Sequence, residues 1–332
     1  MEKKVVLISG GGGYIGSCTA YFLALAGYQP VILDNFSSSQ RPKKFLFPTF
    51  EIDLTQANGL DGLPLEFKKA HAIFHFAAKA LVPESTIKVR DYFYNNINAT
   101  LNLSEFACRS SIPFFIHSST CAVYGHPKLL PISETAPLNP VTPYGHSKLA
   151  SENILQQYSQ WKDLSVLNLR YFNPAGAIHE ANLGELHEPE THLIPNLITS
   201  FIKNTSFEIF GNDYSTADGT CIRDYIHIKD LAKAHVLGLQ FLESQKPMRF
   251  ETLNIGSGKG LSVQEAITLT EKVFNQEAKV SISPRRPGDP PILIADNSKM
   301  KAWLKWEPEF SAMDMIRDHS DFIRLRRSME TL

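Results

Sequence analysis

Apolar runs and helix-like stretches alternate along the first half of the chain. The runs are VVLIS (5–9), PVILD (30–34), AIFHFA (72–77), PFFIHSS (113–119) and SVLNLRYFN (165–173), and residues 14–26, 92–110 and 144–160 between them read as helices. Runs that are apolar nearly throughout are typical of strands buried on both faces. Their alternation with helices predicts an α/β fold with a doubly wound parallel sheet.

The second half is less regular. From about residue 176 prolines and polar loops become frequent, although a helix is predicted at 230–243. Another helix is predicted to begin at Ser262, because SVQE fits a capping box. We therefore expect two domains, 1–175 and 176–332, the second being a smaller α/β domain that is partly interleaved with the first.

A glycine-rich turn, GGGGYIG, follows the first predicted strand. Gly10, Gly13 and Gly16 have the spacing that lets a backbone turn approach a pyrophosphate at the start of a helix. About twenty residues later the second strand ends in Asp34, which is placed to accept hydrogen bonds from an adenosine ribose. This order predicts a Rossmann-type dinucleotide site. The Asp34 carboxylate would repel a 2′-phosphate, so NAD is favoured over NADP.

Composition limits the possible partners. With 33 Lys and Arg against 34 Asp and Glu, the formal charge is −1, so we expect neither nucleic acid nor an anionic membrane as a partner. The four cysteines form no CxxC pair, which favours a reducing, cytoplasmic setting, and no metal is expected. No apolar stretch approaches the length that spans a membrane.

Four segments place a lysine four residues after a tyrosine: YGHPK, YGHSK, YSQWK and YIHIK, beginning at Tyr124, Tyr144, Tyr158 and Tyr225. Pro127 opposes a helix through the first. The third lies at the far end of the 144–160 helix, roughly 20 Å from Tyr144. The fourth reads as a strand that would hold its two side chains about 13 Å apart, before Asp230 caps a helix.

Tyr144 is the best catalytic candidate of the four. It follows Pro143 at the start of a helix, where the cofactor edge of the sheet is expected, and one turn places Lys148 on the same face. A phenol with a pKa near 10 is a poor base at neutral pH, but a nearby ammonium and an oxidised nicotinamide would favour the phenolate. Thr120 either bridges substrate and phenol or is a turn hydroxyl that bonds to its own backbone.

The chain resembles the extended short-chain dehydrogenase/reductase family. GGGGYIGS, Asp34-Asn35, HFAAKALVPES, SSTCAVYG, PYGHSK and LRYFNPAGA occur in that family's order. Within it, IFGNDYSTADGTCIRDYIHIKDLA (209–232), LNIGSG (253–258) and RRPGD (285–289) are similar to the UDP-glucose 4-epimerases. The resemblance implies a homodimer. It also implies reversible C4 epimerisation of UDP-glucose and UDP-galactose through a 4-keto sugar with tightly bound NAD.

The resemblance also implies a set of site residues. Catalysis would use Thr120, Tyr144 and Lys148. Besides the glycines, the cofactor would contact Tyr14, Ile15, Asp34, Asn35, Asp53, Leu54, Phe76, Ala77, Ala78, Asn95, Lys148 and Phe172. Taken alone, Asp53 could equally be a solvated loop acid. The sugar nucleotide would contact Thr120, Tyr144, Asn173, His192, Phe210, Arg223, Tyr225, Arg286, Asp289 and Leu293.

Several alternatives stay open. Leu293 occupies a position whose bulk tends to govern access for N-acetylated sugars, and its intermediate size leaves epimerisation of UDP-GlcNAc/GalNAc open. C4 epimerisation of a UDP-pentose or a UDP-uronate also stays open. A 4,6-dehydratase is disfavoured, because such enzymes place acidic residues where this chain has Cys121 and Ala122. A non-catalytic NAD-binding sensor on the same fold is a further alternative.

Overall fold

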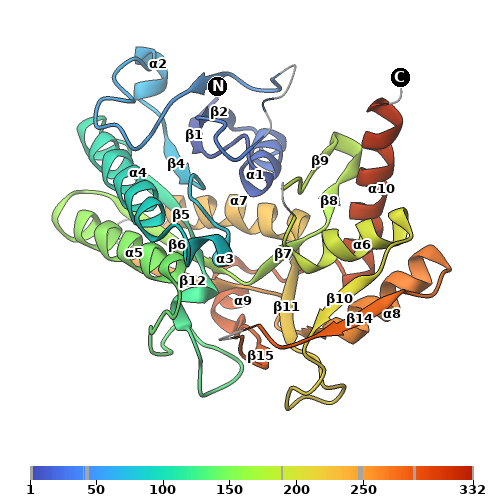
Figure 1. The fold of residues 1–332 in the computed structure, drawn as a ribbon. Coiled ribbons are helices and arrows are strands. Elements are labelled where there is room, and N and C mark those ends of the chain that lie inside the picture. The colour runs from blue at the N-terminus through green and yellow to red at the C-terminus, as the bar shows by residue number, and fades with distance from the viewer. Residues whose placement is uncertain are drawn as a thin grey trace. The chain divides into compact units, whose positions relative to one another are not determined.

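The structure is a computed structural model that describes residues 3–39, 41, 45–187, 190–245, 250–286 and 289–330 (Figure 1). The chain divides into two compact units. Unit 1 consists of Met1–His126, Pro137–Tyr171 and Ala232–Leu253. Unit 2 consists of Pro127–Ala136, Phe172–Leu231 and Asn254–Leu332.

Unit 1 is organised around a seven-stranded sheet with the order β12-β6-β5-β4-β1-β2-β3. The strand pairs from β6 to β3 all run parallel. This confirms the predicted doubly wound α/β fold. The strands are β1 (Val5–Ser9), β2 (Gln29–Asp34), β3 (Thr49–Glu51), β4 (Ala72–His75), β5 (Phe114–Thr120), β6 (Ser165–Tyr171) and β12 (Phe250–Ile255).

Helices cover both faces of this sheet. On β4, the ring of Phe74 lies 6.3 Å from that of His235 on α7, whereas His75 Nε2 lies 3.1 Å from Thr100 Oγ1 on α4. Neighbouring side chains therefore point to opposite helix layers, which is why the strands read as apolar throughout. The helices are α1 (Tyr14–Leu25), α2 (Leu65–Lys68), α3 (Val82–Ser85), α4 (Val89–Arg109), α5 (Pro143–Trp161) and α7 (Ile228–Ser244), with a 3₁₀ turn, η1, at Cys121–Tyr124.

The core of unit 1 lies between the sheet and the pair α4 and α5, which pack against each other (Figure 1). Leu7, Ile73 and Phe115 from the strands and Leu103 and Leu155 from the two helices are all fully buried there. Burying an aliphatic or aromatic side chain of this size contributes about 1.5–3 kcal/mol. This packing holds α5 against β5, and Tyr144 at the start of α5 lies beside Thr120 at the end of β5.

Unit 2 combines short strands with three longer helices. Strand β11 pairs with β7, β13 and β15, β10 pairs with β14, and β8 pairs with β9. The strands are β7 (Asn173–Ala175), β8 (Ala177–Ile178), β9 (Leu183–Gly184), β10 (Phe207–Phe210), β11 (Ile222–His227), β13 (Gly260–Ser262), β14 (Val280–Ser283) and β15 (Ile292–Leu293). The helices are α6 (Leu193–Lys203), α8 (Val263–Phe274), α9 (Ser298–Leu304) and α10 (Ala312–Glu330), with a 3₁₀ turn, η2, at His179–Ala181.

Helices α6, α8 and α10 enclose the core of unit 2, to which Leu197, Ile267 and Ile316 contribute fully buried side chains. The predicted capping box at Ser262 is confirmed. Ser262 Oγ accepts a hydrogen bond from the Glu265 amide, and the Glu265 carboxylate accepts one from the Ser262 amide.

One local prediction was wrong. Helix α7 begins at Ile228, so Asp230 lies inside its first turn and does not cap it. The Asp230 carboxylate instead accepts hydrogen bonds from the amides of Glu309 and Phe310. For the same reason Lys229 belongs to the helix and does not continue the alternation of the strand that holds Tyr225. Within the described residues, no helix combines the length and apolar character needed to cross a membrane.

Candidate active site

The glycine-rich turn connects β1 to α1. Gly10 has φ of +69°, and a Cβ there would lie 2.6 Å from the Ala77 backbone nitrogen. A Cβ on Gly16 would overlap the Gly10 carbonyl oxygen. A Cβ on Gly13 would meet only the Gly10 oxygen at 3.4 Å, which is ordinary contact. Gly10 and Gly16 are therefore required by packing within the protein, whereas the side of the turn next to Gly13 is open.

The start of α1 has the properties of an anion site. Gly13 is its N-cap, no side chain caps it, and its first turn contains no acidic residue. A helix N-terminus directs amide donors and the positive end of the helix dipole outward. The open side at Gly13 allows a phosphate to come close to them, so these residues fit the pyrophosphate of a dinucleotide.

Asp34 shapes this turn from the end of β2. Its Oδ2 accepts a hydrogen bond from the Gly12 amide at 2.8 Å, and its Oδ1 accepts one from the Phe36 amide at 2.7 Å. Each carboxylate oxygen has a second lone pair, so Asp34 can accept further hydrogen bonds from ribose hydroxyls. The next residue, Asn35, accepts hydrogen bonds from the backbone amide and the hydroxyl of Ser37.

The other residues predicted to contact the cofactor are spread over unit 1, apart from one. Asp53 is exposed and accepts hydrogen bonds from the amide and hydroxyl of Thr55, which lower the pKa of its carboxyl against the effect of burial. Leu54 is buried in the core, and Phe172 is buried in unit 2. Tyr14 and Ile15 begin α1, Phe76, Ala77 and Ala78 directly follow β4, and Asn95 lies on α4.

Thr120 and Tyr144 meet where β5 ends and α5 begins. Burial raises the pKa of the Tyr144 phenol to about 12, and a hydrogen bond with the Thr120 side chain opposes this rise. Thr120 Oγ1 also accepts a hydrogen bond from the Ala122 amide at 3.1 Å. Thr120 thus contacts both the phenol and its own turn, and its predicted bridge to a substrate stays a prediction. The Thr142 side chain caps the helix by accepting from the Gly145 amide.

Lys148 lies one turn further along α5 and is buried. Burial lowers the pKa of its ammonium to about 8, although the charge of Glu152 opposes this change. Lys148 Nζ lies 3.3 Å from His117 Nε2, and His117 Nδ1 lies 2.9 Å from Asn168 Oδ1. Because the amide oxygen can only accept, Nδ1 carries the proton and Nε2 accepts from the ammonium. Burial, and then the Lys148 charge, hold the pKa of His117 well below its usual value, so the imidazole is neutral.

Three residues that support this arrangement were not predicted. His117 is one. Asn96 is buried on α4, where its Oδ1 accepts from the Lys79 amide and its Nδ2 donates to Ser147 Oγ at 2.9 Å. Glu152 is also buried and accepts two hydrogen bonds from Arg170, at 2.9 and 2.6 Å. The available signals were a polar run, HSST, inside an apolar strand, and an acid four residues after Lys148.

The structure separates the four tyrosine–lysine segments. Tyr124 ends η1, and its hydroxyl accepts a hydrogen bond from Arg170 at 3.0 Å. Tyr158, near the far end of α5, donates to Glu105 at 3.2 Å. Tyr225 lies on β11. Among the four, the segment at Tyr144 holds both side chains on one turn of one helix beside the end of the sheet.

The predicted sugar-nucleotide residues lie in unit 2, apart from Thr120 and Tyr144. Tyr225 on β11 is the register partner of Asn173 on β7, and Arg223 is the partner of Leu293 on β15. Asn173 Nδ2 donates to the Asp224 carbonyl oxygen at 2.9 Å. Three paired strands therefore bring four of the predicted residues together.

Arg223 and Arg286 lie near each other. Arg223 forms an ion pair with Asp289, and the Arg286 guanidinium lies 4.2 Å from the centre of the Phe210 ring. Burial raises the pKa of the Cys221 thiol, and the charges of Arg223 and Arg286 oppose that rise. Both guanidinium groups therefore lie close to this thiol. Pro287 and Gly288 of the RRPGD segment lie outside the described residues. His192 is the N-cap of α6.

Residues 6–256 match the family model described as the NAD dependent epimerase/dehydratase family. The chain therefore belongs to this family, which confirms the predicted NAD cofactor. It is 42% identical to a UDP-glucose 4-epimerase of Rhizobium leguminosarum bv. trifolii over 97% of this chain and 98% of that protein. The predicted relationship to the UDP-glucose 4-epimerases, which are NAD-dependent isomerases, is thus confirmed.

Two solved structures are similar over nearly the whole chain. That of UDP-glucose 4-epimerase from Brucella ovis in complex with NAD has a TM-score of 0.90 at 38% identity, covering 96% of this chain and 97% of that one. That of the UDP-Glc/GlcNAc 4-epimerase from Campylobacter jejuni has a TM-score of 0.82 at 37% identity, covering 97% and 99%.

The glycine geometry predicts different results for two similar substitutions. Gly16→Ala should lower the thermal unfolding midpoint, because its Cβ would overlap the Gly10 carbonyl oxygen. Gly13→Ala should leave that midpoint nearly unchanged and weaken NAD binding at least about tenfold, because the methyl group would fill the open side. Differential scanning fluorimetry and NAD titration measure the two effects. Unchanged NAD affinity in Gly13→Ala would contradict this assignment of the pyrophosphate site.

The contact between His117 and Lys148 predicts a change in the pH profile. His117→Phe removes the acceptor for the buried ammonium, so the pKa of Lys148 should fall below its present value of about 8. If activity needs the ammonium, the alkaline limb of kcat/KM should move to lower pH. His71→Phe is the control, because His71 pairs with Glu243. An alkaline limb at the same pH in His117→Phe would refute this positioning role.

Proposed function

We propose that the protein interconverts UDP-glucose and UDP-galactose by C4 epimerisation through a 4-keto sugar, with NAD held tightly throughout. One observation carries the proposal: the Tyr144 phenol is hydrogen bonded to Thr120 and stands one helical turn before the buried Lys148. A fixed cation and a hydroxyl beside one phenol are the groups needed to take a proton from a secondary alcohol. The similarity to UDP-glucose 4-epimerases supports this choice of reaction.

In this proposal unit 1 holds the cofactor and performs the chemistry. The amides at the start of α1 receive the pyrophosphate, and Asp34 accepts hydrogen bonds from the adenosine ribose. When bound, NAD⁺ supplies the hydride acceptor and a positive charge. No external redox partner is required, because the cofactor ends each cycle in the oxidised form in which it began.

Tyr144 is the proposed base. With a pKa of about 12, its phenol is almost fully protonated at neutral pH, so it needs positive charge nearby to become an effective base. Lys148 supplies part of that charge from the same helix face. Thr120 can accept a hydrogen bond from the sugar 4-hydroxyl and donate one to the phenolate oxygen, which gives the proton a path to Tyr144.

Unit 2 is the proposed sugar-nucleotide site. Arg223 and Arg286 present planar, multidentate donors of the type that suits a diphosphate. Asp289 holds the Arg223 guanidinium in one orientation, and Phe210 lies flat beneath that of Arg286. Anchoring the nucleotide in this way would leave the hexose free to turn about its diphosphate linkage and present either face of C4.

Epimerisation of another UDP-sugar is the principal alternative. Leu293 is half-buried beside Arg223, and one similar structure is that of an epimerase for both UDP-Glc and UDP-GlcNAc. A 4,6-dehydratase is less well supported, because Cys121 and Ala122 form the turn after Thr120 and neither can replace a carboxylate. A sensor without catalytic activity would not need the Thr120, Tyr144 and Lys148 set.

A cytoplasmic homodimer that serves galactose metabolism is part of the proposal. None of the four cysteines forms a disulfide, which suits a reducing compartment. Tyr94 and Leu101 on α4 are 52% and 36% exposed and lie seven residues apart, so they form an apolar stripe on one face of that helix. A second copy of the chain would cover this stripe.

The activity prediction is tested with UDP-galactose and no added reductant. The wild-type protein should copurify with NAD and produce UDP-glucose. Tyr144→Phe should lower kcat at least about 100-fold, because it removes the proton acceptor. Tyr158→Phe is the matched control, since this tyrosine stands at the other end of the same helix with a lysine four residues later. Parallel assays of UDP-GalNAc and UDP-arabinose separate the alternatives. Full activity in Tyr144→Phe would exclude the mechanism.

The dimer prediction is tested by light scattering after size-exclusion chromatography. The wild-type chain should elute as a dimer. Leu101→Glu places a charge in the apolar stripe and should increase the monomer fraction at low protein concentration. Leu25→Glu, at the exposed end of α1, is the control and should leave the dimer intact. A monomeric wild-type chain, or an unaffected dimer in Leu101→Glu, would show that this face is not the interface.

A further inference from the structure

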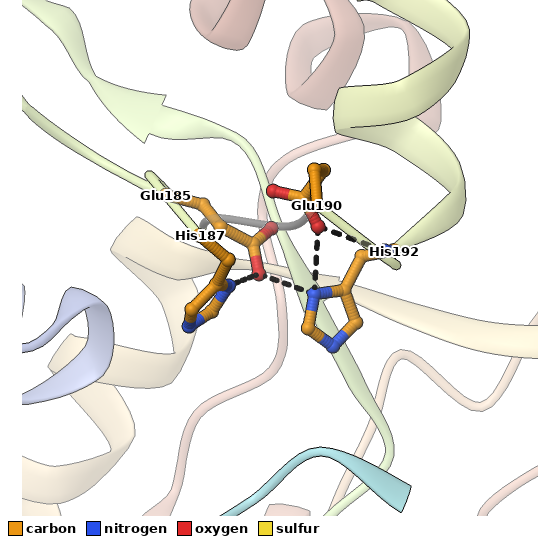
Figure 2. Close-up of side chains that lie close together, drawn as sticks. All are labelled: Glu185, His187, Glu190 and His192. Atoms are coloured by element: carbon orange, nitrogen blue, oxygen red, sulfur yellow. Dashed lines mark hydrogen bonds and ion pairs between the residues drawn. The ribbon is translucent and has the colours of Figure 1, made fainter. Parts of the chain in front are cut away.

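Four potential metal ligands converge in unit 2 between β9 and α6. Glu185, His187, Glu190 and His192 each offer one ligand atom, and these atoms all lie within 4.8 Å of one another. Figure 2 shows the two carboxylates and the two imidazole rings turned toward a common centre.

Three of the distances between ligand atoms approach those of a tetrahedral site. Glu185 Oε1 lies 3.0 Å from His187 Nδ1 and 2.7 Å from His192 Nδ1, and Glu190 Oε1 lies 3.2 Å from His192 Nδ1. Zn²⁺ binds such atoms at about 2.0–2.1 Å, which places neighbouring ligands of a tetrahedron about 3.3 Å apart. Small outward movements of the side chains would therefore make room for an ion.

The backbone already fixes one of the ligands. Glu190 Oε1 accepts hydrogen bonds from the amides of Thr191 at 2.7 Å and His192 at 2.8 Å. The Glu190 carbonyl oxygen accepts one from the Asn196 side chain at 3.2 Å. Such secondary contacts orient ligands before a metal arrives, which reduces the ordering that binding requires.

An ion pair alone leaves part of this cluster unsatisfied. Glu185 Oε1 pairs with both His187 Nδ1 and His192 Nδ1. Yet the Glu185 side chain is only 4% exposed, and its Oε2 has no hydrogen-bond partner within the described part of the chain. A buried carboxylate oxygen without a donor is costly. A metal ion bound by Glu185 would place a positive charge beside this carboxylate.

We propose that Glu185, His187, Glu190 and His192 bind one divalent transition-metal ion, for which Zn²⁺ is the best match. Two imidazole nitrogens and two carboxylate oxygens form a donor set that zinc accepts, whereas Mg²⁺ and Ca²⁺ prefer oxygen ligands only. Four protein ligands fill a tetrahedral zinc site, so the ion has a structural role. It ties the loop after β9 to the start of α6 and fixes the ring of His192.

The test uses the full chain after treatment with a chelator and its removal. Isothermal titration with ZnCl₂ should give one strong site per chain. Glu185→Gln and His187→Gln should each weaken Zn²⁺ binding by about 100-fold or more, since even the loss of a secondary contact typically costs about 10–100-fold. His179→Gln is the matched control, because His179 lies in the same unit and 3.4 Å from both Glu180 and Asp318, outside the cluster. The Zn²⁺ affinity of His179→Gln should equal that of the wild type.

Two results would overturn the inference: no stoichiometric Zn²⁺ binding by the wild type, or equal affinity in the wild type and both ligand variants. Either would show that the cluster is only an ion-pair network. If the variants do not fold, Co²⁺ titration of the wild type decides the question. Intense visible bands of tetrahedral Co²⁺ would support the site, and the weak spectrum of six-coordinate Co²⁺ would refute it. Neither measurement depends on epimerase activity.

Discussion

A positive charge buried one helical turn after Tyr144 is the constraint on which unit 1 depends. Removing an ammonium from water is unfavourable unless neighbouring groups replace its hydration. Here the neutral His117 accepts a hydrogen bond from Lys148, and Glu152 contributes a negative charge one turn away. Parallel pairing of β4, β5 and β6 places His75, His117 and Asn168 in one row beneath the helices. The sheet register therefore determines where this charge can be held.

The two units contain different chemical groups, and the proposed function assigns a different task to each unit. Unit 1 offers amide donors at a helix start, one carboxylate and one buried phenol. Unit 2 offers Arg223 on β11, Arg286 shortly after β14, and a cluster of two histidines and two glutamates. The proposed reaction binds the nucleotide tightly at its diphosphate and holds the sugar loosely. Dividing these groups between two units suits both needs. In the proposal, the residues that hold the diphosphate differ from those that act on the sugar, so the sugar can turn while the nucleotide stays bound.

The strands, helices and glycine turn could be predicted because their signals are local. A strand buried on both faces has few polar residues, a dinucleotide turn needs glycines at fixed spacing, and one helical turn separates Tyr144 from Lys148. Thr120 could be named, but its two simultaneous hydrogen bonds could not. Asp230 was misread as a cap because its true partners, the amides of Glu309 and Phe310, are almost eighty residues away in the chain.

The residues that support Tyr144 and Lys148 could not be predicted either, because their partners are also distant along the chain. The roles of His117, Asn96 and Glu152 come from strand register and helix packing, and the sequence alone contains neither. No metal was expected, because the cysteines lack ligand spacing. The cluster at Glu185 depends instead on the proximity of two acids and two histidines, which spacing in the sequence does not reveal. Its proposed metal revises that expectation.

The central claim is that Tyr144 ionises near neutral pH once NAD is bound. The most direct measurement is a pH titration of near-ultraviolet tyrosinate absorption in the NAD-bound protein, taken as the difference between wild type and Tyr144→Phe. The account predicts one phenolate in the difference that titrates well below the ordinary tyrosine pKa of about 10. A difference that develops only at or above that value would contradict it.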